Sequence, residues 1–96
     1  MILYNISLII EDSSHDELLS WVIQLLKEIP HESKFLKMLD NPHEGTTYCI
    51  QVTSSDDYTF TQIQKDITQV IQDYIGSHHN GKAFIFDSVM QYIPQQ

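Results

Sequence analysis

Alternation of side-chain character over residues 2–10 is the feature that most constrains this fold. Side chains at even positions would share one face of an extended strand, and all five are apolar: Ile2, Tyr4, Ile6, Leu8 and Ile10. The odd positions mix polar and apolar residues, and successive side chains of a strand point to opposite faces of a sheet. The chain therefore begins with a strand that presents one wholly apolar face and one mixed face.

A helix is predicted over residues 15–28. Its apolar stripe, at the spacing of one helix face, comprises Leu18, Val22, Leu25 and Ile29. Ser14 and Glu17 have the three-residue spacing of a capping box, and acidic residues suit the positive end of a helix. Pro30 ends the helix because proline lacks an N–H and disfavours helical backbone before it.

Two further strands are predicted at residues 34–39 and 46–53, and the second of them alternates cleanly. The link between them, Asn41-Pro42-His43-Glu44-Gly45, is rich in turn-forming residues. A link this short favours an antiparallel hairpin.

The last part of the chain predicts a helix and a strand. The helix begins between Ser54 and Asp57 and continues to Ile75, with Gly76 as the residue just beyond its end. Residues 78–81 form a loop, and residues 82–93 form a strand that is apolar on both faces. The order is β-α-β-β-α-β over a single domain of residues 1–96. That order predicts an α+β, ferredoxin-like fold, a four-stranded antiparallel sheet with both helices on one face.

This arrangement leaves one face of the sheet uncovered. The side chains expected there are partly apolar: Leu3, Asn5, Ser7, Ile9, Cys49 and Gln51. A half-apolar open face and a doubly apolar last strand favour a homodimer in which two sheets face each other. A chain of this length also buries only about 60% of its unfolded surface by itself.

Composition excludes two classes of partner. Acidic residues outnumber lysines thirteen to five, arginine is absent, and the formal net charge is −8. Nucleic acids and anionic membranes both require clustered cations, so neither is an expected partner. No apolar run is long enough to span a membrane. The single cysteine, Cys49, cannot form an internal disulfide, which favours a cytoplasmic location.

Polar residues on the expected open face form the candidate ligand site. Asn5, Ser7 and Gln51, with either Asp87 or Ser88, are predicted to converge there. Isolated polar groups in an apolar setting are typical of a small-ligand pocket, and equally of hydrogen bonds buried in a dimer interface. Both interpretations remain open at this point.

His15 is the candidate acid/base residue. It lies in the first turn of the first helix among Glu11, Asp12 and Asp16, whose charges can tune its protonation. The alternative is that His15 only packs and makes local hydrogen bonds. Whether the protein is an enzyme or binds a ligand without catalysis, His15 is expected to join the ligand-binding residues in a closed pocket with Asn5 and Gln51.

No metal or cofactor site is expected. The spacing of the candidate metal ligands fits no metal motif; these candidates are His31, His43, Glu44, His78 and His79. The adjacent pair His78-His79 is interpreted as solvated loop residues. Cys49 is interpreted as a small packing residue, since nothing beside it in the sequence would activate a thiol.

Several segments together resemble a family of short uncharacterised bacterial proteins, domain of unknown function 4286. The matching segments are Tyr4-Asn5-Ile6-Ser7, His15-Asp16-Glu17-Leu18 with Trp21, Ile29-Pro30, Gly45-Thr46-Thr47-Tyr48-Cys49-Ile50-Gln51, and Gly81-Lys82 with Phe86. The resemblance implies a ferredoxin-like fold related to the dimeric α+β barrels, and it implies no activity.

The function expected from these observations is a binding or structural role in a small homodimer, with a small-ligand pocket between the sheet faces. The alternative is a cofactor-free oxygenase or isomerase that uses His15 as its acid/base. That alternative rests on analogy between folds.

Overall fold

The computed structural model describes residues 1–40, 44–55 and 57–95, and it has the predicted element order. The elements are β1 (Ile2–Ile10), η1 (Asp12–Ser14), α1 (His15–Glu28), β2 (Lys34–Lys37), β3 (Thr46–Ser54), α2 (Asp57–Ile63), η2 (Gln64–Thr68), α3 (Gln69–His78) and β4 (Ala83–Gln91). Of the predicted boundaries, those of β1 and α1 agree with the structure residue for residue.

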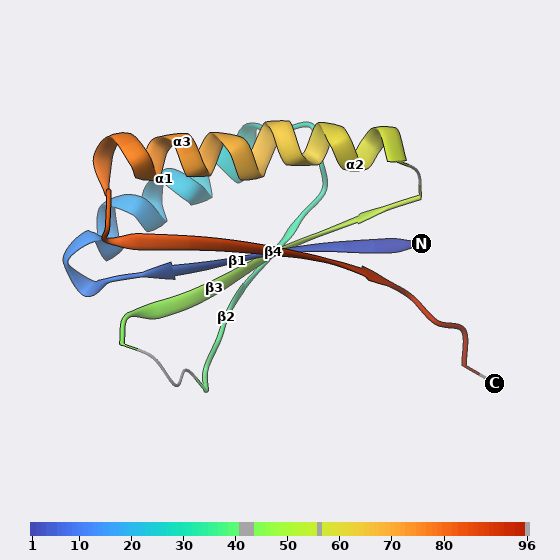
Figure 1. Ribbon diagram of the computed structural model, residues 1–96, viewed down its shortest axis with the longest axis horizontal. Helices are drawn as coiled ribbons and strands as arrows, with labels where there is room; N and C mark the ends of the chain where they lie inside the picture. The colour runs from blue at the N-terminus through green and yellow to red at the C-terminus, as the bar shows by residue number, and fades with distance from the viewer. Residues whose placement is uncertain (41–43, 56, 96) are drawn as a thin grey trace.

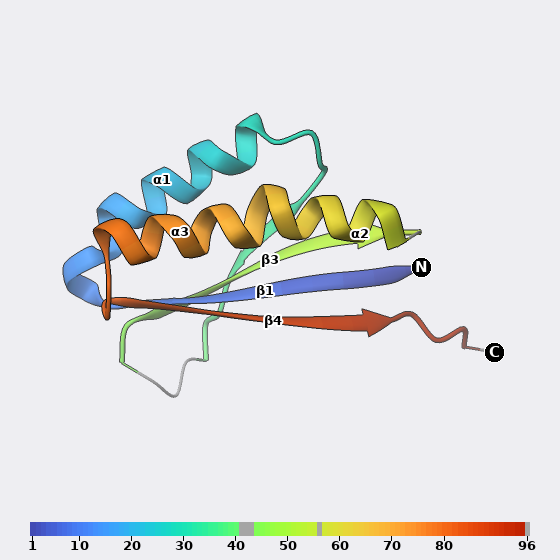
Figure 2. The same cartoon turned by 45° about the horizontal axis from the view of Figure 1, so that its top comes forward.

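The four strands form one antiparallel sheet in the order β2-β3-β1-β4. Both helical segments lie over the same face of this sheet, and no helix among the described residues covers the other face (Figures 1 and 2). The ferredoxin-like prediction is confirmed. β1 is a central strand because it pairs along its whole length with both β3 and β4.

The core lies between the sheet and the helices. Side chains with no solvent exposure supply its centre: Tyr4, Ile6, Leu8, Ile10, Leu18, Val22, Ile50, Ile63, Ile67 and Ile71. The even positions of β1 face this core, as their alternation predicts. The apolar burial that stabilises the fold is therefore concentrated on one side of the sheet.

The second helix contains a π-helical turn, η2, between α2 and α3. Its buried residues Ile63, Ile67 and Ile71 recur every four positions. In an α-helix each step of four overshoots a full turn by about 40°, so such a row drifts away from the sheet. The wider π turn takes up this drift and keeps all three isoleucines on the core.

One predicted helix end and one predicted capping interaction are wrong. The second helix does not stop before Gly76 but continues to His78, and the positive φ that favours glycine occurs at Gly81 instead. At the start of α1 the Ser14 side chain makes no capping hydrogen bond, and the Glu17 carboxylate accepts from Tyr74 and His79. β2 is shorter than predicted, and β4 runs from Ala83 to Gln91 rather than from 82 to 93.

The tight turn before β3 contains Gly45, with φ of +84°. A Cβ on this residue would lie 2.5 Å from the carbonyl oxygen of Ile10. Positions 41–43 of the predicted turn lie outside the described residues. None of the helices that the structure describes is long and apolar enough to cross a membrane.

Candidate functional site: the open sheet face

We call the uncovered side of the sheet the open face. The strand register assigns to it Leu3, Asn5, Ser7 and Ile9 of β1, Lys34 and Leu36 of β2, Thr47, Cys49, Gln51 and Thr53 of β3, and Phe84, Phe86, Ser88 and Met90 of β4. All six residues predicted for this face lie on it. The two edge strands add further apolar side chains.

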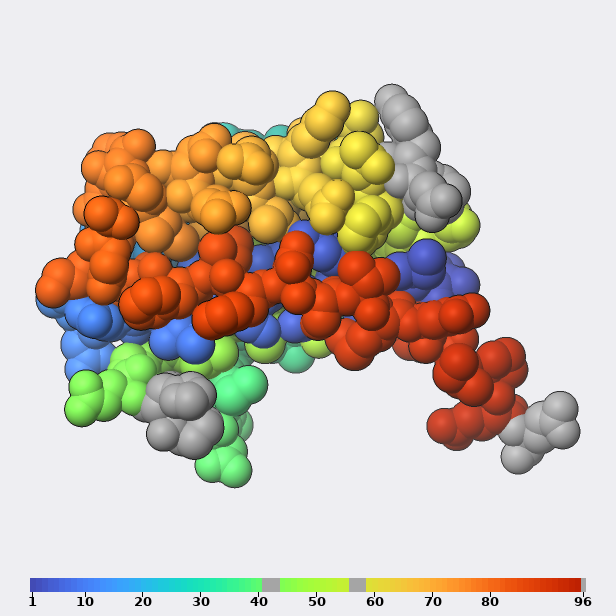
Figure 3. All heavy atoms as spheres, in the orientation of Figure 1, coloured from blue at the N-terminus to red at the C-terminus, as the bar shows by residue number. Residues whose placement is uncertain are grey.

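Large apolar side chains on the edge strands are exposed to solvent. On β4, half or more of the surface of Phe84 and Phe86 is accessible, at 50% and 59%. Met90 of the same strand and Leu36 of β2 are each 44% exposed. Figure 3 shows β4 along the near edge of the sheet, beneath the α2–α3 helix, with its outer side uncovered. Apolar groups gathered on one surface in this way are typical of interaction sites.

None of the described strand residues on the open face carries a carboxylate. Among its strand residues Lys34 alone is charged, although the chain has thirteen acidic residues. The prediction that Asp87 is an alternative to Ser88 on this face is wrong. Asp87 pairs with Ile6 and faces the helices, whereas Ser88 pairs with Asn5 and lies on the open face.

Polar side chains form a hydrogen-bonded row across the middle of the open face. The Gln51 amide donates to Oδ1 of Asn5 at 3.3 Å, and the Asn5 amide donates to Oγ of Ser7 at 3.1 Å. Oγ of Ser7 lies 3.8 Å from Sγ of Cys49. Three of the predicted ligand-site residues, Asn5, Ser7 and Gln51, are therefore in direct contact.

His15 does not join that row. Its Nδ1 donates to Oδ1 of Asp16 at 2.8 Å, which leaves Nε2 of a neutral ring to accept from the Tyr48 hydroxyl at 2.7 Å. Tyr48 pairs with Leu8 on the helix-covered side, so a closed pocket of His15, Asn5 and Gln51 does not form. Burial, with a smaller contribution from the Asp16 charge, raises the pKa of Tyr48.

A cavity of about 400 Å³ lies at one end of the sheet. Its lining comprises Leu3, Pro30, His31, Glu32, Ser33, Lys34, Gln51, Val52, Thr53, Thr59 and Tyr92. Gln51 thus belongs both to the polar row and to the wall of this cavity. His31 is the histidine that lines it, with Nε2 donating to Oδ2 of Asp66 at 2.8 Å. Sequence reasoning missed this pair because its members lie 35 residues apart.

Asp87 is exposed at the rim of the helix-covered side, where it contacts the buried Tyr4. Its Oδ2 accepts a hydrogen bond from the Tyr4 hydroxyl at 2.6 Å, and that hydroxyl lies 2.8 Å from Oγ1 of Thr68. Burial, reinforced by the hydrogen bond to the Asp87 carboxylate, raises the pKa of Tyr4 to about 12. The cluster ties β1, β4 and the π turn together.

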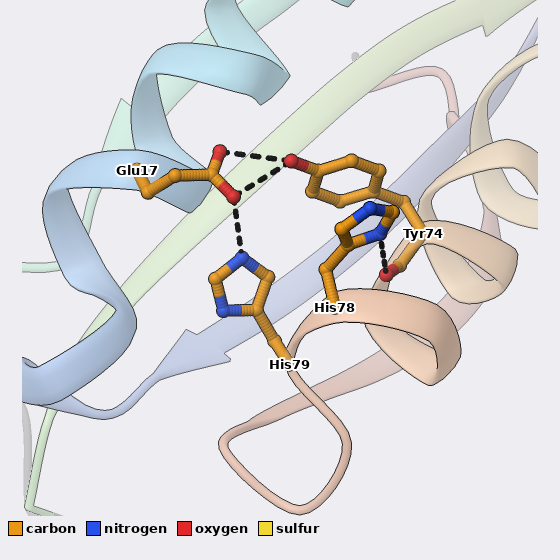
Figure 4. A network of polar contacts seen from close by, with 4 residues as sticks. All are labelled: Glu17, Tyr74, His78 and His79. Carbon is orange, nitrogen blue, oxygen red and sulfur yellow. Dashed lines mark hydrogen bonds and ion pairs between the residues drawn. The ribbon is translucent and has the colours of Figure 1, made fainter.

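A second polar cluster ties α1 to α3 (Figure 4). The Glu17 carboxylate accepts from the Tyr74 hydroxyl at 2.6 Å and from Nε2 of His79 at 2.7 Å. The Tyr74 ring is stacked between Trp21 and His78, at centroid distances of 3.9 and 4.3 Å.

The interpretation of His78-His79 as solvated loop residues is therefore wrong for His79, which is 9% exposed. His78 lies in the last turn of α3 and packs on Tyr74. The hydrogen bond from Tyr74, followed by that from His79, lowers the pKa of Glu17. The same bond to Glu17 raises the pKa of Tyr74.

Within the described ranges, no three His, Cys, Asp or Glu side chains are grouped so that they could hold a metal ion. His43, considered above with the other histidines, lies outside these ranges. Cys49 is partly buried beside Ser7.

Comparison with protein families decides what kind of chain this is. Residues 1–93 match the model of the domain of unknown function DUF4286. The chain belongs to the DUF4286 family. The resemblance noted from its sequence motifs is confirmed, and no curated protein matches this DUF4286 chain.

Solved structures of other proteins share the fold of this DUF4286 domain. It is similar to a de novo designed protein, Foldit4 (TM-score 0.61, 6% identity, covering 96% of this chain and 98% of the other). It is also similar to a dabb family protein with a ferredoxin-like fold from Mesorhizobium loti (TM-score 0.52, 9% identity, covering 100% of each chain).

A third similar structure is the apo form of CPII, a nitrogen regulatory PII-like protein from Thiomonas intermedia K12. Its TM-score is 0.50 at 9% identity, over 96% of this chain and 92% of that one. Identities this low show a shared fold and nothing about activity.

Proposed function

We propose that this DUF4286 domain is a non-catalytic binding or structural module that works as a homodimer, with the open faces of two copies packed together. One observation carries the proposal: in a chain of net charge −8, none of the strand residues described on the open face is acidic, and this face exposes Phe84, Phe86 and Met90. Depletion of charge combined with large apolar side chains is the composition of an interface core.

A second copy of the chain fits this face better than an unrelated partner. Two acidic copies repel each other unless they meet where neither presents an acid, and the open face meets that condition. Both of its edge strands carry exposed apolar residues, so a twofold axis through the polar row would place apolar groups of one copy against those of the other.

The open face is large enough to form a specific dimer interface. Strands about 4.8 Å apart, with about 3.3 Å per residue, give this sheet a footprint of roughly 500 Å² per copy. Two copies would bury about 1,000 Å² in total, and the protruding side chains would add to this area. The smallest specific protein–protein interfaces bury about the same area. Burial of this size would supplement a core that is small for an independent domain.

The polar row would then lie inside the interface. Asn5, Ser7 and Gln51 remain the ligand candidates between the two faces, because amide and hydroxyl groups in an otherwise apolar enclosure can orient a small molecule. The position of His15 on the other side of the sheet argues against the alternative of an enzyme with His15 and Asn5 in one active site. We assign the domain to the cytoplasm, where Cys49 would stay reduced.

Sedimentation equilibrium at micromolar concentration tests the dimer. The expected mass is twice the chain mass of 11.2 kDa. Phe86→Asp places a charge on the open face and should weaken association by about tenfold or more. Val89→Asp is the matched control, because Val89 is on the same strand, 54% exposed, and on the opposite face.

Phe84→Asp repeats the test at a second position, and circular dichroism confirms that each variant is folded. A wild-type protein that sediments as a single chain would overturn the proposal. So would equal weakening by Phe86→Asp and Val89→Asp.

A further inference from the structure

The cavity at the end of the sheet exists because β2 and β3 differ in length. β2 begins at Lys34, which pairs with Gln51, while β3 continues to Ser54. Beside Val52 and Thr53 the sheet therefore lacks its β2 neighbour, and the segment from Pro30 to Ser33 passes at a distance instead. The space left between them is the cavity of about 400 Å³, which is within the size range of small-molecule sites.

The polar lining of this cavity consists mainly of groups that can donate hydrogen bonds, and its hydroxyl and amide groups can also accept them. Hydroxyl, amide, imidazole and ammonium groups come from His31, Ser33, Lys34, Gln51, Thr53, Thr59 and Tyr92. Lys34 supplies the positive charge and is the one charged strand residue of the open face. Among the lining residues that the structure describes, Glu32 is the carboxylate, and it is exposed.

His31 is held in a fixed orientation. Its Nε2 is engaged by Asp66 of η2 at 2.8 Å, and the imidazole is 13% exposed. A carboxylate that accepts from one ring nitrogen fixes the direction of an imidazole and leaves Nδ1 as its second polar atom. Asp66 does not itself line the cavity, so it acts on a ligand only by positioning His31.

We propose that this cavity binds a small monocarboxylate. The carboxylate lies against the Lys34 ammonium, where a charge-assisted hydrogen bond is available. The hydrocarbon part of the ligand packs on the apolar side of the lining, Leu3, Pro30 and Val52. Every one of these residues belongs to a single chain, but Leu3 and Lys34 also lie on the open face, so the cavity and the proposed dimer interface share part of their surface.

Glu32 determines how much charge the site accepts. Its carboxylate repels a second negative charge on a ligand, which favours monoanions over dianions. Replacing it by Gln would remove repulsion and tighten the binding of a monocarboxylate. If the true ligand were an amino acid, Glu32 would pair with the ammonium group and the same replacement would weaken binding. The sign of this effect separates the two ligand classes.

Isothermal titration of the wild-type protein with four-carbon compounds tests the proposal. Butyrate, butanol, butylamine and 2-aminobutyrate share a chain and differ in charge. We expect butyrate to bind most tightly, and amide resonances of residues 31–34 and 51–53 to shift in NMR spectra as it is added.

The variants Lys34→Gln and Lys37→Gln form a matched pair. Both lysines are exposed on β2, but Lys37 pairs with Tyr48 and lies on the other face. Lys34→Gln should raise the butyrate Kd by about tenfold or more. Lys37→Gln should leave it unchanged, and Glu32→Gln should lower it.

Three results would overturn the monocarboxylate site: butanol binding as well as butyrate, equal loss in the two lysine variants, or weaker butyrate binding by Glu32→Gln. Tighter binding of 2-aminobutyrate that is lost in Glu32→Gln would instead assign the cavity to an amino acid. Sedimentation of the same samples reports the dimer separately, so failure of the cavity and failure of the interface give different results.

Discussion

The hydroxyl of Tyr4 donates to Oδ2 of Asp87 at 2.6 Å and joins the first strand to the last on the buried side of the sheet. Thr68, on the π turn of the second helix, lies 2.8 Å from the same hydroxyl. Three segments that are distant in sequence thus meet at one phenol. An ionised Tyr4 would place a negative charge in contact with the Asp87 carboxylate.

Tyr4→Phe should destabilise the protein by about 1–3 kcal/mol at neutral pH, because it leaves the Asp87 carboxylate without this donor. The pKa of folded Tyr4 is about 12 against an ordinary value of 10.0. A raised pKa stabilises the fold below pH 10, and that contribution is lost as pH rises toward 12.

Urea unfolding at a series of alkaline pH values measures this effect. The wild-type free energy of unfolding should fall by about 2–3 kcal/mol more than that of Tyr4→Phe over this interval. Tyr92→Phe, at an exposed tyrosine, serves as the control. Parallel curves for wild type and Tyr4→Phe would contradict the assignment.

Glu17→Gln should reduce the acid sensitivity of the fold. Hydrogen bonds from Tyr74 and His79 lower the pKa of Glu17 below its ordinary value of 4.5. The resulting stabilisation is complete above pH 4.5 and is lost as pH falls through the lowered value. Thermal unfolding should show a smaller decrease in Tm on acidification for Glu17→Gln than for wild type.

Glu28→Gln provides the comparison for that experiment. Glu28 lies on the same helix and accepts a hydrogen bond only from its neighbour Gln24, at 2.9 Å. The Glu28→Gln variant should therefore have the same acid transition as the wild-type protein. If both variants behave alike, the cluster around Glu17 makes no particular contribution.

His15 and Tyr48 should show coupled contributions to stability. Their side chains lie 2.7 Å apart between α1 and β3. We expect His15→Ala and Tyr48→Phe each to destabilise the fold by about 1 kcal/mol, and the double variant by less than the sum. Urea denaturation of the four proteins measures the coupling. A coupling energy of zero would show that this contact does not stabilise the protein.

Gly45→Ala should destabilise the fold far more than Gly81→Ala. Both glycines have positive φ, which costs about 1 kcal/mol for alanine. At Gly45 the new Cβ would also lie 2.5 Å from the Ile10 carbonyl oxygen, whereas at Gly81 it would meet nothing within 4 Å. Equal changes in Tm for the two variants would show that the turn adjusts to the added methyl group.

The open face was predicted more accurately than the residues around it. Alternation placed Asn5, Ser7 and Gln51 on one side of the sheet, and their contact then followed from the strand register. The same alternation failed for Asp87, because β4 carries apolar residues on both faces and its pattern does not show which face is buried. The Asp87 side chain is placed by the Tyr4 hydroxyl.

The helices were also predicted only in part: their approximate positions were correct, but their side-chain contacts and the π turn were not. The start of the first helix was predicted, but the assignment of Glu17 to a capping box was wrong, because Tyr74 and His79 offer it stronger donors. The π turn was not predicted, since a four-residue repeat of isoleucines still resembles an ordinary helical stripe over a short stretch. The π turn is needed because the row of isoleucines must stay against one face of the sheet, and only the tertiary structure shows this.

Periodicity and charge were sufficient to determine the element order, the ferredoxin-like fold and the partly apolar open face, because burial of one face imposes its period on the local sequence. Tertiary structure alone decided which polar groups meet. Glu17 with His79, Tyr4 with Asp87, and His31 with Asp66 are separated by 62, 83 and 35 positions. Hydrogen bonds require contact within about 3 Å, and only the packed fold brings such distant residues that close.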